Sequence, residues 1–138
     1  MKIIVDTNVI LDFLLLREPH MADAKELFKM TAQEEVEAFT TASSVTDIYY
    51  IIAKRLGSDT ARGAVRHMLT MLGVIAVDGE DCIDALDLPI ADFEDALVTA
   101  CANREDINYI VSNDKEFLKL DNSLANVVGT RAFLDFVG

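Results

Sequence analysis

The sequence predicts an α/β fold, a three-layer α/β/α sandwich with a mostly parallel central sheet. Short runs of β-branched and other apolar residues at 3–5, 74–77 and 109–112 are typical of strands buried on both faces. Between these runs, apolar residues recur every three or four positions, which is the spacing of amphipathic helices. Because parallel strands are joined by long crossovers, strands that alternate with helices favour a parallel sheet covered on both faces.

In the first half of the chain, cap and turn residues separate the predicted elements. Thr7 or Asn8 can cap a helix that follows the first strand, and Pro19 suits the first position of the next helix. Ser43 or Ser44 can cap a third helix, because an acidic residue stands on its first turn. The expected strands and helices of this half lie at 3–5, 9–14, 19–30, 37–41 and 45–56.

The second half of the chain continues this alternation. Ser58 or Asp59 can begin a helix that Gly73 ends. A buried strand follows at once, and then two helices, another strand, a short helix, a last strand and a terminal helical turn. The expected elements before that turn lie at 61–72, 74–77, 80–88, 92–104, 109–112, 115–120 and 126–129.

Length and composition indicate one domain, residues 1–138, that buries a core without disulfides. The hydrophobic share of 51% and the charged share of 26% are those of an ordinary globular protein. The apolar run at 9–16 contains Asp12 and is too short to span a bilayer. No segment has the long uncharged core of a secretory signal, so we expect a cytoplasmic protein with no membrane partner.

Acidic residues recur where the predicted strands end and the helices begin. Asp6 and Asp114 follow strands, at the edge where open α/β sheets keep their ligand crevice. Asp92 and Asp95 share the first turn of one helix, and Asp47 stands on the first turn of another. Each suits a helix cap when taken alone, but carboxylates brought together repel unless a cation lies between them. Oxygen ligands without His or Cys suit Mg²⁺ or Mn²⁺.

Four short motifs, in this order along the chain, resemble those of the PIN-domain nucleases. The similarity covers essentially the whole chain and is greatest with the small stand-alone prokaryotic members, which include the toxins of VapBC-type toxin–antitoxin pairs. The motifs are Asp6-Thr7-Asn8 after a strand, Asp47 in a Ser-Ser-Val-Thr-Asp helix start, Asp92-x-x-Asp95-Ala96-Leu97, and Ser112-Asn113-Asp114-Lys115-Glu116-Phe117.

The resemblance implies a catalytic role for each acidic residue. Asp47 matches a position where the toxin members usually carry Glu. Because its side chain is one methylene shorter, the resemblance does not decide whether Asp47 contacts the metal directly. Asp92 matches an additional acid that many members have on the same turn. The metal ligands are matched by Asp6, Asp95 and Asp114. Residues that orient the carboxylates or the bound water are matched by Thr7, Asn8 and Ser112.

The activity implied by the resemblance is that of an endoribonuclease that cleaves single-stranded RNA with water activated by Mg²⁺ or Mn²⁺. It also implies the toxin of a toxin–antitoxin pair, with a cognate antitoxin as partner. Two alternatives remain open: a PIN-like interaction module without activity, and a metal-dependent phosphatase. Asn8 counts against the phosphatase, because such enzymes usually carry a second Asp two residues after the nucleophilic one. Apolar residues on the middle helices suit a homodimer or an antitoxin interface, namely Tyr49, Tyr50, Leu69 and Met71.

The net charge of −12 argues against a protein that holds nucleic acid by bulk electrostatics. RNA must therefore meet local basic residues away from the acidic edge, and we expect its binding to be weak and steeply dependent on salt. The candidate contacts are Arg17, Lys54, Arg55, Arg62, Arg66 and Lys115.

Overall fold

A computed structural model describes all residues from 1 to 138 and confirms the predicted α/β class. Five strands form one sheet in the order β3-β2-β1-β4-β5, and every neighbouring pair is parallel. The chain first adds β2 and β3 on one side of β1 and then crosses to add β4 and β5 on the other side. The strand order therefore reverses between β1 and β4. Such a reversal opens a crevice at the carboxyl ends of the two strands. The strands are β1 Lys2–Val5, β2 Glu37–Thr41, β3 Gly73–Ile75, β4 Tyr109–Val111 and β5 Val127–Val128.

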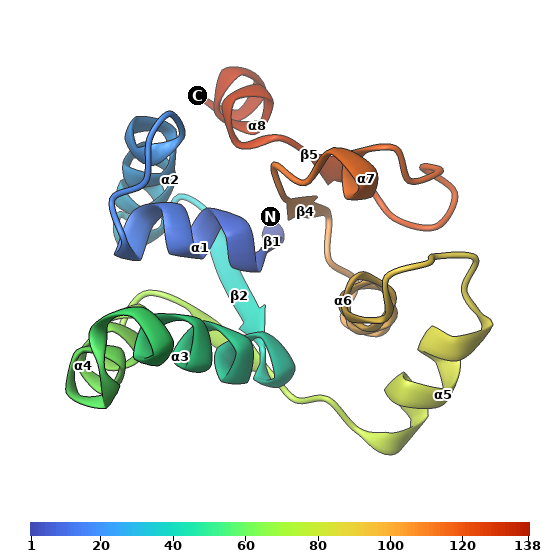
Figure 1. Cartoon of the computed structure of the whole chain (residues 1–138). Coiled ribbons are helices and arrows are strands. Elements are labelled where there is room, and N and C mark those ends of the chain that lie inside the picture. The colour runs from blue at the N-terminus through green and yellow to red at the C-terminus, as the bar shows by residue number, and fades with distance from the viewer.

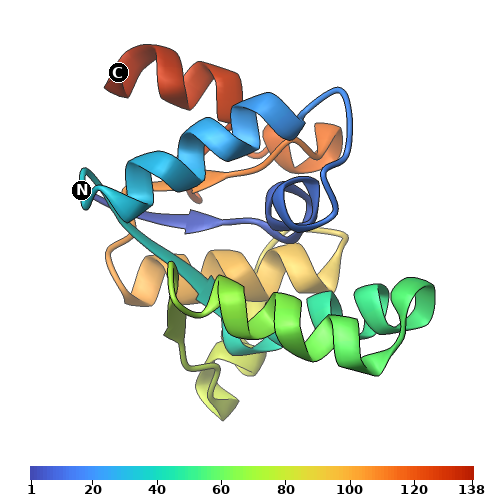
Figure 2. The same cartoon turned by 90° about the vertical axis from the view of Figure 1, so that its left-hand side faces the viewer.

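Helices cover both faces of this sheet, as Figures 1 and 2 show. One face carries α1 to α4 and α8, and the other carries α5, α6 and α7. None of these helices combines the length and the apolar character that crossing a membrane requires. The helices are α1 Thr7–Leu14, α2 Met21–Ala32, α3 Ala42–Leu56, α4 Ser58–Met68, α5 Gly79–Asp87, α6 Phe93–Arg104, α7 Lys115–Leu118 and α8 Thr130–Val137.

The alternating side chains of β1 divide the core into two parts. Ile3 and Val5 belong to the larger cluster, which is shared with α1, α2, α3, α4 and α8. Ile4 points to the opposite face, where it joins Ile110 of β4 and Val98 of α6 in a second cluster. Because successive residues of a strand face opposite sides, a run of three buried residues needs apolar partners on both faces. Burial on both faces is therefore why the sequence of β1 shows no polar alternation.

Several element boundaries differ from the predicted ones by a few residues. Asp6, rather than Thr7 or Asn8, caps α1, because its own side chain accepts the Thr7 N–H. Thr41, rather than Ser43 or Ser44, caps α3 by accepting the Ser44 N–H. Pro19 lies in a turn before α2 instead of at its first helical position. At α1 and α3 the cap is the residue whose side chain reaches a free N–H group of the first turn.

The third strand also differs from its prediction, since it spans Gly73–Ile75 and is an edge strand. Val74 is 47% exposed, so the expectation of a strand buried on both faces is wrong there. Gly73 does not simply end a helix, because it begins the strand against the ring of Phe39. A Cβ added at Gly73 would lie 2.8 Å from Phe39 Cδ1, so this close approach requires glycine.

Arg104, at the end of α6, ties that helix to the connection before it. Its guanidinium donates to both carboxylate oxygens of Asp81 at 2.9 Å and to the Ala76 carbonyl at 2.6 Å. Asp81 is buried, and the guanidinium lowers the pKa of its carboxyl. This bidentate pair holds α5 against α6, the helix whose first turn carries Asp92 and Asp95.

Candidate active site

Acidic side chains from four parts of the chain border one hollow at the carboxyl edge of the sheet. Asp6 and Asp114 follow β1 and β4, on either side of the point where the strand order reverses. Asp47 comes from the first two turns of α3, and the remaining acids come from the start of α6. The hollow has a volume of about 590 Å³ and is bordered by six carboxylates: Asp6, Asp47, Asp92, Glu94, Asp95 and Asp114.

Three of these carboxylates form the tightest group. Asp6, Glu94 and Asp95 each place one oxygen within 4.8 Å of the other two. Asp6 and Asp95 are buried, with only 4% and 7% of their surfaces exposed, whereas Asp114 is exposed and lies outside this group. The structure therefore gathers Asp6 and Asp95 as expected, but Glu94 rather than Asp114 completes the cluster.

Glu94 was not among the acidic residues that the sequence predicted for the site. Its side chain accepts a hydrogen bond of 3.1 Å from Ser44 Oγ, and Ser44 in turn receives one of 2.9 Å from Thr41 Oγ1. These bonds join the first turn of α3 to the first turn of α6. The signal in the sequence was three acids on one helical turn beside a hydroxyl-rich helix start.

A network of side chains fixes the orientation of Asp6. Its Oδ2 accepts hydrogen bonds of 2.7 Å from Ser112 Oγ and 3.0 Å from Asn8 Nδ2, and its Oδ1 accepts the Thr7 N–H. Asn8 Nδ2 also donates to Ser112 Oγ at 3.1 Å, and Ser112 Oγ accepts the Asp114 N–H at 3.1 Å. These contacts are the ones expected of residues that orient a carboxylate. Thr7 also borders the hollow, and its hydroxyl oxygen is buried without any hydrogen-bond partner.

Burial raises the pKa of all three clustered carboxyls. Desolvation and then the charge of Asp6 raise the pKa of Glu94 to about 8 and that of Asp95 to about 7. The pKa of Asp6 is also raised, chiefly by burial, although its hydrogen bonds from Ser112 and Thr7 oppose the change. Ionised carboxylates so close together are costly without a cation. The set offers oxygen donors alone, so it fits a hard divalent ion such as Mg²⁺ or Mn²⁺.

These raised pKa values predict that the metal-free protein loses stability as the pH rises from about 5 to about 8. The folded state binds protons at Glu94 and Asp95 more tightly than the unfolded chain, whose carboxyls titrate near pH 4. Stability is therefore highest below the unfolded pKa values, near pH 4, and is lost as the pH rises through the folded values of about 7 and about 8. Thermal unfolding in EDTA at several pH values measures the trend, and saturating Mn²⁺ should remove it. A melting temperature that rises over this range would contradict the assignment.

The predicted basic contacts do not all reach the acidic hollow. Lys54 and Arg17 border it, and Arg17 is already bound to Asp12 at 3.0 Å and to the Asn8 carbonyl at 3.1 Å. Arg62 and Arg66 border a separate hollow between α3 and α4. The two that border neither of these hollows are Arg55 and Lys115, both exposed.

Comparison with known proteins finds one family and several relatives. A family model described as PIN domain matches residues 2–116. Ribonuclease VapC1 of Aquifex aeolicus (strain VF5) is 25% identical over 125 residues, which cover 87% of this chain and 86% of that protein.

Several solved structures share the fold, and two of them illustrate the likeness. VapBC2 from Rickettsia felis, bound to a DNA fragment from their promoter, aligns with a TM-score of 0.70 at 14% identity over 94% of this chain and 98% of that chain. Mycobacterium tuberculosis VapC20, a toxin that cleaves the sarcin–ricin loop, aligns with a TM-score of 0.67 at 20% identity over 83% of this chain and 92% of that chain. At these low identities the structural likeness shows a shared fold alone.

Proposed function

The chain belongs to the PIN-domain family, and on this premise we propose that it is an endoribonuclease that uses Mg²⁺ or Mn²⁺ to cleave single-stranded RNA. The observation that carries the proposal is the convergence of carboxylate oxygens from Asp6, Glu94 and Asp95 within 4.8 Å, two of these residues being almost fully buried. RNA as the substrate is supported by the relative named Ribonuclease VapC1, which matches most of this chain.

In this proposal Asp6 and Asp95 hold the cation, with Glu94 completing the cluster and Asp114 at its exposed side. When bound, a divalent cation lowers the pKa of a water molecule and offsets the charge that develops on the phosphate. Ser112 and Asn8 hold Asp6 in a single orientation. This preorganisation means that the carboxylate need not rearrange during the reaction.

Two carboxylates at the rim can accept a proton from the attacking water. Asp92 uses Oδ1 to cap the Asp95 N–H at 3.0 Å, which leaves its Oδ2 free toward the hollow. Asp47 lies on α3 and is exposed at the rim of the same hollow. A carboxylate that is exposed and not committed to a cation is the kind of group that general-base catalysis needs.

The substrate must approach through a field that is mostly negative. Lys54 is the exposed cation at the rim, and Arg55, Arg62 and Arg66 continue from it along α3 and α4. Lys115 adds a charge beside Asp114. With a net charge of −12, we expect weak RNA binding that falls steeply as salt is added.

The proposal extends to a toxin of a toxin–antitoxin pair, with a cognate antitoxin protein and a second copy of the chain as partners. Solved structures that share the fold include a toxin–antitoxin complex from Klebsiella pneumoniae and DNA-bound VapBC from Salmonella typhimurium. Tyr50 and Leu69 are 66% and 44% exposed on α3 and after α4, which is unusual for large apolar side chains and suits an interface.

The phosphatase alternative receives no support from the site. It requires an acid two residues after Asp6, and that place holds Asn8. The Asn8 amide nitrogen donates to both Asp6 and Ser112, so the residue there acts as a hydrogen-bond donor. The inactive interaction module differs from the proposed enzyme in activity alone.

Two measurements with the same protein test the proposed function. An unstructured RNA should be cut in Mg²⁺ or Mn²⁺ and left intact in EDTA. Mn²⁺ at about 100 times its dissociation constant should add roughly 2.7 kcal/mol to the free energy of unfolding, because it binds the folded state alone. Stabilisation by Mn²⁺ without cleavage would identify an interaction module. If Mn²⁺ neither stabilises the protein nor supports cleavage, the metal site is overturned.

A further inference from the structure

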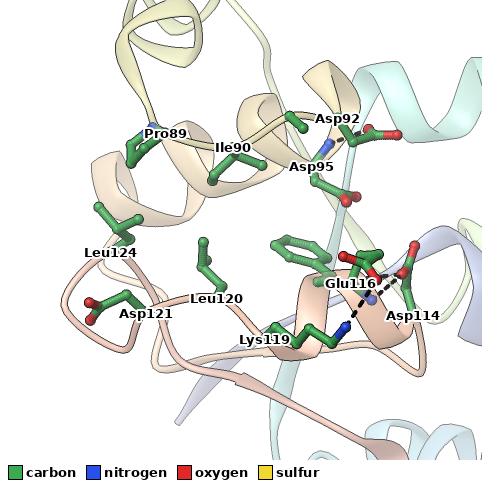
Figure 3. A pocket seen from close by; sticks show the side chains of 12 residues that line it. Pro89, Ile90, Asp92, Asp95, Asp114, Glu116, Lys119, Leu120, Asp121 and Leu124 are labelled. Carbon is green, nitrogen blue, oxygen red and sulfur yellow. Dashed lines mark hydrogen bonds and ion pairs between the residues drawn. The ribbon is translucent and has the colours of Figure 1, made fainter.

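A second hollow, of about 450 Å³, adjoins the acidic one. Asp92, Asp95 and Asp114 border both hollows, so the two are continuous at these three side chains. The second hollow lies between the connection from α5 to α6 and the segment that includes α7 and the residues after it (Figure 3). An RNA strand bound at the acidic cluster therefore has a neighbouring cavity within reach.

Apolar side chains form part of the wall of this second hollow, and six of its twelve bordering residues are charged. Pro89 and Ile90 form one side, and Leu120 and Leu124 lie across from them, as Figure 3 shows. Phe117, which is 2% exposed, contributes to the lining from α7. The volume of this hollow is within the range of sites that take a small ligand.

Polar groups stand at the open edge of the hollow. Lys119 is the one cation among its bordering residues, and its Nζ lies 3.2 Å from Glu116 Oε1 with both side chains largely exposed. Asp121 accepts the Ser123 N–H at 2.9 Å, which fixes the turn beside Leu124. The acids around the entrance disfavour an anionic ligand inside the hollow, whereas a neutral planar ring between the apolar side chains carries no such penalty.

We propose that this hollow binds the base of the nucleotide next to the scissile phosphate. The inference rests on the proposed ribonuclease function. With the scissile phosphate at Asp6 and Asp95, the adjoining nucleotide passes Asp92 and Asp114 and its base enters between Ile90 and Leu120. Contact between a single-stranded base and apolar side chains removes apolar surface from water and is tolerant of base identity, because every base has a flat apolar face. Lys119 is then placed to meet the next phosphate of the strand.

The experiment uses a short single-stranded RNA in which one abasic nucleotide is moved position by position past the cleavage site. With Mn²⁺, the wild-type protein should lose roughly tenfold in kcat/KM when the abasic nucleotide falls at one position beside the scissile bond. Leu120→Trp fills the hollow and should lower kcat/KM on intact RNA by a similar factor, with no further loss from the abasic position. Ala91→Trp, on the exposed opposite side, repeats the test in a loop that tolerates bulk.

Leu118→Trp is the matched control, because Leu118 is 39% exposed and does not border the hollow. It should behave as the wild type with every RNA. Cleavage that is indifferent to the abasic position and to Leu120→Trp would overturn the base site and leave the ribonuclease standing, with an apolar side chain of a protein partner as the remaining occupant.

A separate readout distinguishes failure of the proposed function from failure of the base site. Fluorescence anisotropy measures binding of the same RNAs whether or not they are cut. If no RNA is cut but binding weakens about tenfold with Leu120→Trp and not with Leu118→Trp, the ribonuclease proposal fails and the base site stands. If neither cleavage nor binding responds, both are overturned.

Discussion

Replacing Asp95 by Asn is expected to lower metal-dependent RNA cleavage by about 10²–10³-fold. The carboxylate of Asp95 is part of the buried cluster with Asp6 and Glu94, so an amide there removes charge that the cation needs. Initial rates on an unstructured RNA, measured over a range of Mn²⁺ concentrations, give the loss in kcat/KM. Asp84→Asn makes the same chemical change on the exposed surface of α5 and should leave cleavage unchanged.

The same variant is expected to be more stable than the wild type when no metal is present, but only at high pH. Because the pKa of Asp95 is about 7, its charge adds repulsion above that pH and is absent near pH 5. Asp95→Asn should therefore raise the free energy of unfolding by ~1 kcal/mol at about pH 8 and change it little at about pH 5. A side chain that acts only as a helix cap would show full activity and no such dependence on pH.

Asp6→Asn is expected to behave differently from Asp95→Asn. Asp6 accepts hydrogen bonds from Thr7, Asn8 and Ser112, and an Asn side chain would turn an N–H group toward some of these donors. The carboxyl of Asp95 accepts no such hydrogen bond, because the hydrogen bonds of this residue involve its backbone N–H and carbonyl. Asp6→Asn should therefore lose both activity and stability, while Asp95→Asn separates the two.

Local sequence signals were sufficient to predict the placement of four acids in the site. Asp6 and Asp114 end β-branched runs, and in a parallel sheet the ends of adjacent strands share one edge. Asp92 and Asp95 share a turn because residues three apart on a helix are neighbours. These relations depend on residues close in sequence and on one rule of topology, so they follow without knowledge of tertiary packing.

The contribution of Glu94 could not be predicted in that way. Whether its side chain turns toward Asp6 depends on how α6 is rotated against α3, where Ser44 donates to it. That rotation is set by core packing and by the Arg104–Asp81 pair, which joins residues 23 positions apart. The same limit applies to Arg62, since its helix packs on α3 and carries it to a different hollow.

The observed ends of several helices and strands also differ from the predicted ones because they depend on contacts with other parts of the chain. Several residues before α1 and α3 have side chains suited to capping, and the choice depends on where the strand stops. Gly73 resembled a helix end in sequence, and only the ring of Phe39 on the neighbouring strand explains why glycine is needed at the start of β3. The fold class survives such shifts because it rests on the alternation of strands and helices.

Ser112→Ala is expected to weaken both the fold and the metal site. Ser112 is fully buried, and its hydroxyl donates to Asp6 and accepts N–H groups from Asn8 and Asp114. Removing it leaves these groups without their partner at the join of β1 and β4. The cost should be about 1–3 kcal/mol of unfolding free energy, measured by urea denaturation in EDTA. The affinity for Mn²⁺ and the rate of cleavage should each fall by about 10–100-fold, because Asp6 loses the group that orients it.

Comparing the two losses shows whether Ser112 acts through the site or through the fold alone. Ser58→Ala is the control, because Ser58 is exposed at the start of α4 and makes no side-chain hydrogen bond in the structure. If Ser112→Ala lowers stability while the Mn²⁺ affinity of the folded protein stays at the wild-type value, the residue supports only the strand ends. A parallel loss of affinity would instead mean that a single buried hydroxyl, 106 positions from Asp6 in sequence, sets the geometry of the carboxylate that the cation needs.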